Sequence, residues 1–222
     1  MPIHARPHRP PLTAARRLGL TALALVLSAC SAPATKPAAA APNAADAAMA
    51  AATAAPDPLQ GLRRLCGKAY AGRVVVDTPK SADDPFAGKP LIMHVRECGP
   101  LEIRVPFHVG DDRSRTWVFS AHDGELRLKH DHRHEDGSPD KLTMYGGDQR
   151  RYARGPRLEF PADAYSQVLF RAQGREVSVS NVWAIEIDER RFVYELARTG
   201  RLFRVEFDLS RPVAPPPPPW GG

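Results

Sequence analysis

The sequence predicts an all-β protein: a single antiparallel, up-and-down β-barrel preceded by one short helix. Two observations predict this class. Apolar residues recur mostly at every second position, which is the period of a strand with one buried face. Turn-forming residues separate these segments at short intervals. Only residues 58–67 show helical spacing, with Leu59, Leu62 and Leu65 three residues apart. A β-sandwich is the alternative architecture.

The alternation is clearest in residues 101–109, where Leu, Ile, Val, Phe and Val alternate with Glu, Arg, Pro and His. Asp123-Gly124 predicts a two-residue hairpin turn, because Asp-Gly accepts the positive φ values of a type I′ turn. Met-Tyr-Gly-Gly-Asp at 144–148 is expected to be a strand end that runs into a turn, with Tyr145 lining the cavity mouth as the alternative. Further alternating segments lie at 117–121, 126–128, 183–187, 192–196 and 203–209.

Four regions are expected along the chain. Residues 1–29 form a signal peptide, and residues 30–57 form a tether, because 15 of the 27 residues from 31 to 57 are alanine. Residues 58–213 form the barrel domain, which is long enough for one real core. Residues 214–222 form a tail with five successive prolines, which favour an extended polyproline II conformation.

The N-terminal region has the parts of a bacterial lipoprotein signal. A basic segment with four arginines and no acidic residue precedes an apolar run at 18–27. Ten residues are too few for a membrane-spanning helix, which needs about 20. The run ends in Leu27-Ser28-Ala29-Cys30, which resembles the lipobox. This resemblance implies that Cys30 receives a diacylglyceryl group and anchors the chain, with Ser31 favouring the outer membrane facing the periplasm.

The charge of the chain argues against a nucleic-acid partner. The sequence has 31 Lys and Arg and 25 Asp and Glu, for a formal net charge of +6. Four of the arginines belong to residues 1–29, so the mature chain would carry +2. The basic character is therefore largely a targeting feature. We expect a monomer whose membrane contact is the N-terminal lipid.

With Cys30 lipidated, Cys66 and Cys98 remain, and an even pair outside the cytoplasm is expected to form a disulfide. The segments 69–77 and 90–98 are expected to pair as a hairpin around residues 78–89, which places Cys66 opposite Cys98. A loop of this length would stabilise the fold by about 3–4 kcal/mol.

The segment 126–136 carries the most suggestive chemistry. If the strand continues through it, His130, His132 and His134 extend its apolar face. The hairpin at Asp123-Gly124 then sets three partners opposite them. Trp117 faces His130, Arg115 faces His132 and Arg113 faces His134. These six residues would form a pocket with an apolar floor and a cationic mouth rich in imidazole.

Three functions are open for this segment. The pocket could bind a small amphipathic or anionic ligand through Arg113, Arg115 and the histidines. Alternatively, His130, His132 and His134 could bind zinc, as a metal-binding protein or enzyme, although the arginines would repel a cation. The histidines could also pair with nearby acids in a structural or interaction protein. No nucleophile elbow, phosphate loop or metalloprotease helix is present, which disfavours an enzyme but leaves the metal-dependent alternative open.

Two resemblances accompany these patterns. The segments 107–119 and 128–138 and the Pro-Pro-Trp-Gly tail resemble a family of uncharacterised lipoproteins from xanthomonad-type proteobacteria. That family has no assigned activity, so the resemblance implies localisation and a single domain. The order of one short helix followed by eight to ten strands resembles the calycin architecture of lipocalins and fatty-acid-binding proteins. This resemblance implies a ligand-binding barrel, in some members with an arginine-anchored carboxylate.

Overall fold

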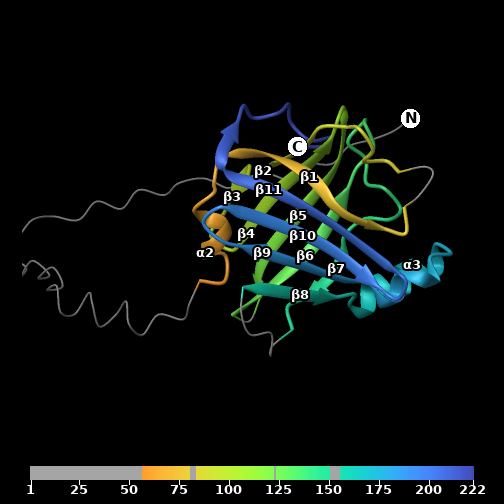
Figure 1. The fold of residues 1–222 in the computed structure, drawn as a ribbon. Helices are drawn as coiled ribbons and strands as arrows, with labels where there is room; N and C mark the ends of the chain where they lie inside the picture. Colours follow the sequence, from red (N-terminus) through yellow and green to blue (C-terminus); the bar gives the residue numbers. More distant parts are fainter. Residues whose placement is uncertain (1–56, 81–83, 123, 151–155) are drawn as a thin grey trace, which may run out of the picture. The chain divides into compact units, whose positions relative to one another are not determined.

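The computed structural model describes residues 57–80, 84–122, 124–150 and 156–222. The predicted signal peptide, Cys30 and nearly all of the predicted tether lie outside these residues. Within them, the predicted all-β class is confirmed. Eleven antiparallel strands form one sheet that curls into a nearly closed barrel (Figure 1). The β-sandwich alternative is not observed.

The strands follow one another around the wall in up-and-down order. The order is β7-β6-β5-β4-β2-β1-β11-β10-β9-β8, with the short β3 paired to β4. Because β1 pairs with β11, the first and last strands of the domain are neighbours. The bounds are β1 (Ala69–Thr78), β2 (Leu91–His94), β3 (Glu97–Cys98), β4 (Glu102–Val109), β5 (Asp112–His122), β6 (Glu125–His132), β7 (Tyr145–Asp148), β8 (Arg157–Pro161), β9 (Val182–Ile187), β10 (Arg191–Arg198) and β11 (Arg201–Val213).

The barrel closes between β7 and β8 by close packing of two backbones, without a strand ladder. The Arg150 N–H donates to the Glu159 carbonyl, and the Asp163 N–H donates to the Gly146 carbonyl, each at 2.9 Å. A Cβ atom on Gly147 would lie 1.8 Å from the Pro161 carbonyl oxygen. The turn predicted at 145–148 is therefore wrong. The two glycines allow a strand to approach its neighbour closely.

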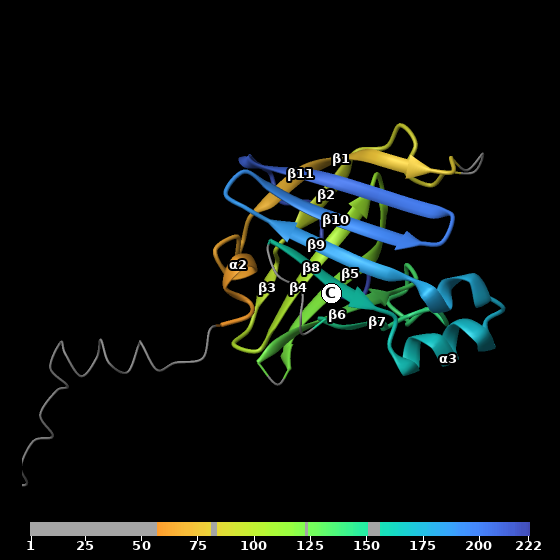
Figure 2. The same cartoon turned by 60° about the horizontal axis from the view of Figure 1, so that its bottom comes forward.

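Helices stand at the two ends of the barrel (Figure 2). The predicted N-terminal helix is confirmed as α2 (Gln60–Arg63), whose Leu62 is fully buried. At the opposite end lie α3 (Ala164–Ala172) and a 3-10 helix, η1 (Glu176–Ser180), neither of which was predicted. Asp163 caps α3 by accepting the Ser166 N–H at 2.8 Å. No helix among the described residues is long and apolar enough to span a membrane.

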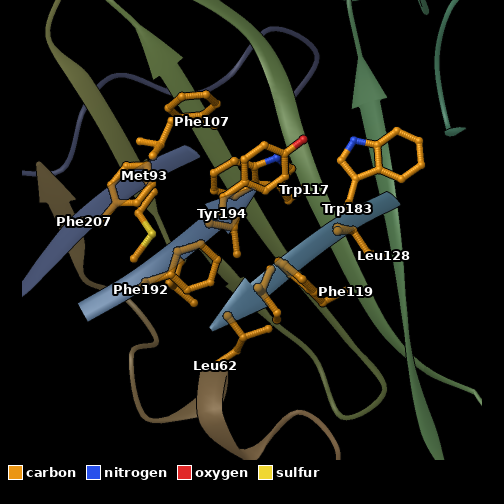
Figure 3. Close-up of a cluster of buried hydrophobic side chains, with 14 of the residues drawn as sticks. Leu62, Met93, Phe107, Trp117, Phe119, Leu128, Trp183, Phe192, Tyr194 and Phe207 are labelled. Atoms are coloured by element: carbon orange, nitrogen blue, oxygen red, sulfur yellow. The ribbon is translucent and has the colours of Figure 1, made fainter. Parts of the chain in front are cut away.

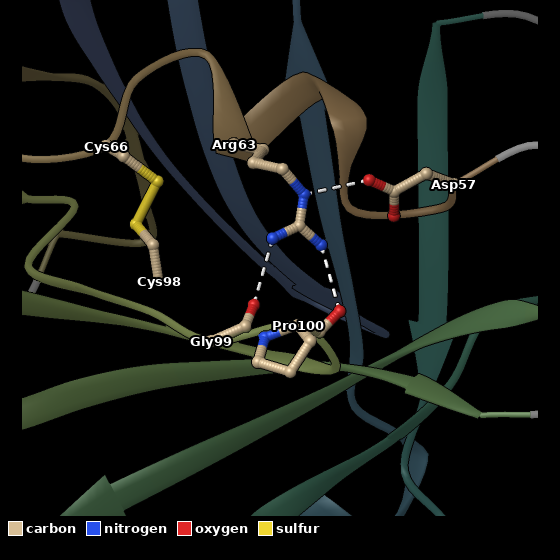
Figure 4. Close-up of a disulfide and its surroundings, with 6 residues drawn as sticks. All are labelled: Asp57, Arg63, Cys66, Cys98, Gly99 and Pro100. Carbon is tan, nitrogen blue, oxygen red and sulfur yellow. Dashed lines mark hydrogen bonds and ion pairs between the residues drawn. A yellow bond between two sulfur atoms is a disulfide. The ribbon is translucent and has the colours of Figure 1, made fainter. Parts of the chain in front are cut away.

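The end of the barrel next to α2 is fastened covalently. The predicted disulfide between Cys66 and Cys98 is present, with 6.2 Å between the Cα atoms (Figure 4). Beside it, Arg63 donates to the carbonyls of Gly99 and Pro100 at 2.9 and 3.0 Å. These contacts tie the helix to the turn between β3 and β4.

The predicted register of this hairpin is wrong by one residue. Ala69 pairs with His94 and Tyr70 with Met93, and β2 ends at His94. Cys98 therefore lies on the separate strand β3, which pairs with β4. The disulfide links the helical segment to β3 beyond the end of the β1–β2 ladder.

Large apolar side chains fill the part of the barrel nearest α2 (Figure 3). Trp117 lies at the boundary of this core that faces away from α2. Its ring stacks on Phe107 with 4.8 Å between the ring centroids, and on Tyr194 with 4.5 Å between them. The core below Trp117 includes Leu62, Met93, Phe119, Leu128, Phe192 and Phe207, all at most 2% exposed. The interior is thus filled with apolar side chains at the end next to α2, and the lining of the opposite end is different.

Candidate functional site

A cavity of about 450 Å³ lies inside the barrel at the end away from α2. Its walls come from the inner faces of β5, β6, β7, β9 and β10, and its rim from the segments that carry η1 and the β10–β11 turn. Among the described residues, the lining has eight aromatic side chains, two histidines and four arginines. The cavity therefore combines apolar walls with a cationic rim.

The predicted hairpin places two of the expected pairs in this cavity. The β5–β6 ladder runs to the pair His122 and Glu125, the register that a turn at Asp123-Gly124 predicts, while Asp123 itself lies outside the described residues. Trp117 pairs with His130 and Arg115 pairs with His132, and all four residues line the cavity. The register that the Asp-Gly turn predicts is confirmed up to His132, where β6 ends.

His130 is a buried, neutral histidine. Burial, followed by the nearby His132, lowers its pKa from 6.5 to about 3. Its Nδ1 lies 3.1 Å from the Tyr145 backbone oxygen, which can only accept, so the ring proton is assigned to Nδ1. Nε2 is then the acceptor for the Tyr194 hydroxyl at 2.8 Å. Both ring nitrogens of His130 are used inside the protein.

Tyr194 is held protonated in the same network. Burial first, then Tyr145, raises the pKa of its phenol well above 10.0. Hydrogen bonding from the indoles of Trp117 and Trp183 acts in the opposite direction. Tyr194, Trp117 and Trp183 are drawn together in Figure 3. The cavity floor therefore presents polar atoms among its aromatic rings.

A second histidine–tyrosine pair forms the adjoining wall. The Tyr145 hydroxyl lies 3.0 Å from Nε2 of the half-buried His132. Burial and then Arg115 lower the pKa of His132 to about 4, although Asp140 acts to raise it. Burial raises the pKa of Tyr145 to about 12. The Tyr145 ring also stacks on His130 at 4.8 Å. Both pairs are uncharged at neutral pH.

Two of the predicted site residues lie away from the cavity. His134 follows the end of β6 and is exposed, with its Nε2 3.8 Å from Asp140. Arg113 holds the C-terminal tail on the outside of the barrel: its guanidinium donates to the Pro218 carbonyl at 3.0 Å, and its own carbonyl accepts the Trp220 N–H at 3.1 Å. Alternation predicted both positions in the mouth, but β6 ends at His132, before His134. Arg113 belongs to β5 and lies where the β4–β5 register shifts, between Arg115 and Asp112.

The zinc alternative gains no support from this geometry. The three imidazoles do not converge, because His134 is exposed and both nitrogens of His130 are already hydrogen-bonded. Across residues 57–222, apart from the undescribed gaps, no group of three or more His, Cys, Asp or Glu side chains is placed to hold a metal ion.

Several cavity residues were not predicted as site residues. Trp183 and Tyr194 occupy the apolar faces of predicted strands, where they count as ordinary core. Arg198 and Arg201 flank the Thr199-Gly200 turn, and Arg175 precedes η1. The alternation could have indicated that the two aromatic residues face inward. Only the closed barrel brings the arginines to the same rim as Arg115.

Comparison with protein-family models, with curated proteins and with solved structures finds no match for this chain. The resemblance to xanthomonad-type lipoproteins therefore stays a prediction from the sequence. The calycin-like topology rests on the observed strand order.

The buried histidines predict a stability that falls in acid. Below pH 6.5 the unfolded chain takes up a proton at His130, whereas the folded chain does so only near its pKa of about 3. The contribution of the neutral histidines to the free energy of unfolding should therefore be complete above pH 6.5. It should fall by up to about 1.4 kcal/mol per pH unit per histidine as the pH drops toward 3.

Urea unfolding between pH 4 and 7.5 measures this dependence. His130→Phe should reduce the pH slope by up to one proton, because one titrating group is removed. Phe119→Leu is the control: it weakens the neighbouring core and should leave the slope unchanged. An unchanged slope in His130→Phe would contradict the assignment of a neutral His130.

Proposed function

We propose that this chain is a lipid-anchored envelope protein whose barrel binds a small amphipathic ligand in the cavity at its open end. The single observation that carries the proposal is the cavity itself. Its volume of about 450 Å³ lies within the usual range of small-molecule sites, roughly 300–1,000 Å³. It occupies one end of a barrel whose other end is filled with side chains.

The cavity is not a natural outcome of packing for stability. Protein interiors are close-packed, and an unfilled space loses the dispersion contacts of the atoms around it. Here hydrogen bonds from Tyr194 to His130 and between Tyr145 and His132 fix the rings of the wall in place around the space. A ligand that fills the space would restore the lost contacts.

The distribution of polarity supports an amphipathic ligand. Trp117, Phe170 and Trp183 offer apolar surface to the cavity. The rim carries Arg115, whose guanidinium lies 5.9 Å from the centre of the Phe86 ring. An apolar body inside and a polar group at the mouth would match both environments.

The envelope location is supported by two features at a distance from the cavity. The sequence from residue 1 to Cys30 has the order of a lipoprotein signal. The disulfide between Cys66 and Cys98 suits an oxidising compartment such as the periplasm. A monomer tethered at the outer membrane would then meet ligands of the envelope.

A cavity-filling substitution tests the binding function. Leu196→Trp adds an indole at a half-buried lining position, and we expect it to weaken ligand binding at least about tenfold by occupying the site. Leu101→Trp makes the same change at a side chain that is 66% exposed and lies outside the cavity.

Native mass spectrometry of protein purified from the envelope under non-denaturing conditions reads the result. The wild type and Leu101→Trp should carry a bound small molecule, and Leu196→Trp should lack it. Two results would contradict the proposal. The wild type could show only the mass of the ligand-free protein, or Leu196→Trp could retain the bound molecule in full.

Replacement of the acylated residue tests the anchor. Cys30→Ser removes the thiol that the diacylglyceryl group requires, so the chain should leave the outer-membrane fraction and lose its lipid-modified N-terminal peptide in mass spectrometry. Ala29→Gly is the matched control, since it keeps the thiol. Unchanged outer-membrane retention of Cys30→Ser would contradict lipidation at this position.

A further inference from the structure

The four arginines at the rim of the cavity divide into two kinds. Arg115 forms an ion pair with Asp112, and Arg201 forms one with Asp77. Arg201 also lies against an aromatic ring of the mouth, Phe203, at 5.6 Å. These two cations are neutralised within the fold and help to build the rim.

Arg175 and Arg198 have no ion pair with any described carboxylate. Arg198 is half-buried and donates one hydrogen bond, at 3.4 Å, to the side-chain oxygen of Asn181. Asp140 is the one acidic residue among the described lining residues, and it contacts His134, the Leu142 backbone N–H and the His132 carbonyl rather than an arginine of the rim. The rim therefore keeps cationic groups that the protein does not compensate.

The placement of Arg198 is unfavourable for the protein alone. It stands directly opposite Arg201 across the β10–β11 ladder, and like charges at such positions are destabilising. Burial and then the charge of Arg201 lower the pKa of the Arg198 guanidinium. Binding of an anion at this rim would remove the repulsion and replace it with charge-assisted hydrogen bonds.

The body of the cavity is aromatic rather than aliphatic. Among the lining residues that the structure describes, eight are Phe, Tyr or Trp and only two are leucines. Trp183 lies 5.6 Å from Tyr145 in a stacked orientation, and Trp117 lies 4.5 Å from Tyr194. Flat rings favour stacked or edge-on contacts with other rings, and a flexible acyl chain cannot use this preference.

We propose that the ligand is an aromatic oxyanion, with its rings against Trp117 and Trp183 and its carboxylate, sulfonate or phosphate group held by Arg175 and Arg198. This inference rests on the proposed binding function and adds its chemical class. It also moves the anion site away from Arg113, which holds the tail. The site now consists of Arg175, which precedes η1, and Arg198, the last residue of β10.

Two fluorescent probes that differ by one charged group test the anion site. 8-Anilinonaphthalene-1-sulfonate carries the sulfonate, and N-phenyl-1-naphthylamine has the same rings without it. Their affinities are measured by fluorescence titration on the full chain of the wild type, Arg175→Gln, Arg198→Gln and Arg73→Gln. Arg73 is the matched control, because its side chain is 78% exposed and does not line the cavity.

The expected result is selective. The sulfonate should bind about ten- to a hundredfold more weakly to Arg175→Gln and Arg198→Gln, and the neutral probe should bind all four proteins alike. Equal sulfonate affinity in all four proteins overturns the anion site. If neither probe binds the wild type, the proposed binding function itself fails.

Competition tests the aromatic part separately. 2-Naphthoate should displace the neutral probe at a concentration at least about tenfold below that of decanoate, which has the same charge on an aliphatic chain. Displacement by decanoate at the lower concentration would overturn the aromatic class.

Discussion

The aromatic layer around Trp117 determines what the barrel can contain. Trp117 stacks on Phe107 and Tyr194 and meets Phe192 and Phe207 at 5.8 and 6.1 Å. Below this layer, side chains from the wall and from α2 fill the interior. Above it lies the cavity. A smaller residue at position 117 would leave a space between the filled end of the barrel and the cavity. The cavity therefore depends on the Trp117 ring, which contacts both regions.

The hydrogen-bonded histidine–tyrosine pairs give the cavity a fixed polar wall without adding charge. His130 and His132 are kept neutral by burial, and the phenols of Tyr194 and Tyr145 keep their protons for the same reason. Positive charge is confined to the arginines of the rim. This separation suits a ligand that enters with its apolar part first and leaves its charged group at the mouth.

The sequence predicted those parts of the site that depend on local pattern. The turn-forming pair Asp123-Gly124 was enough to predict Trp117 opposite His130 and Arg115 opposite His132. A two-residue turn allows one register of the two strands. Alternation also predicted an apolar inner face. The same reasoning failed for His134, because it assumed that the strand continues past His132. It failed for Arg113, because it assumed a regular β5 where the β4–β5 register shifts.

The remaining parts depend on contacts between distant segments. Tyr145 begins a strand, β7, whose Gly146 closely approaches Leu128 of β6 and whose Gly147 closely approaches Pro161 of β8, and this pair of glycines resembles a turn in the sequence. Arg198 is linked to the segment after η1 by the β9–β10 pairing and by its hydrogen bond to Asn181, and only the curled sheet brings Arg175 and Arg198 to the same rim as Arg115. Helix α3 was missed because its apolar face is short, with Phe170 as its one large buried side chain.

The three tryptophans allow the most direct test of the central claim, that the open end of the barrel is a binding cavity. Trp117 and Trp183 line it, whereas Trp220 lies on the tail outside the barrel. Indole N–H resonances, assigned from single Trp→Phe variants, are followed by NMR as N-phenyl-1-naphthylamine is added. The account predicts shifts for Trp117 and Trp183 and none for Trp220. Binding that moves only Trp220, or none of the three at saturation, would contradict it.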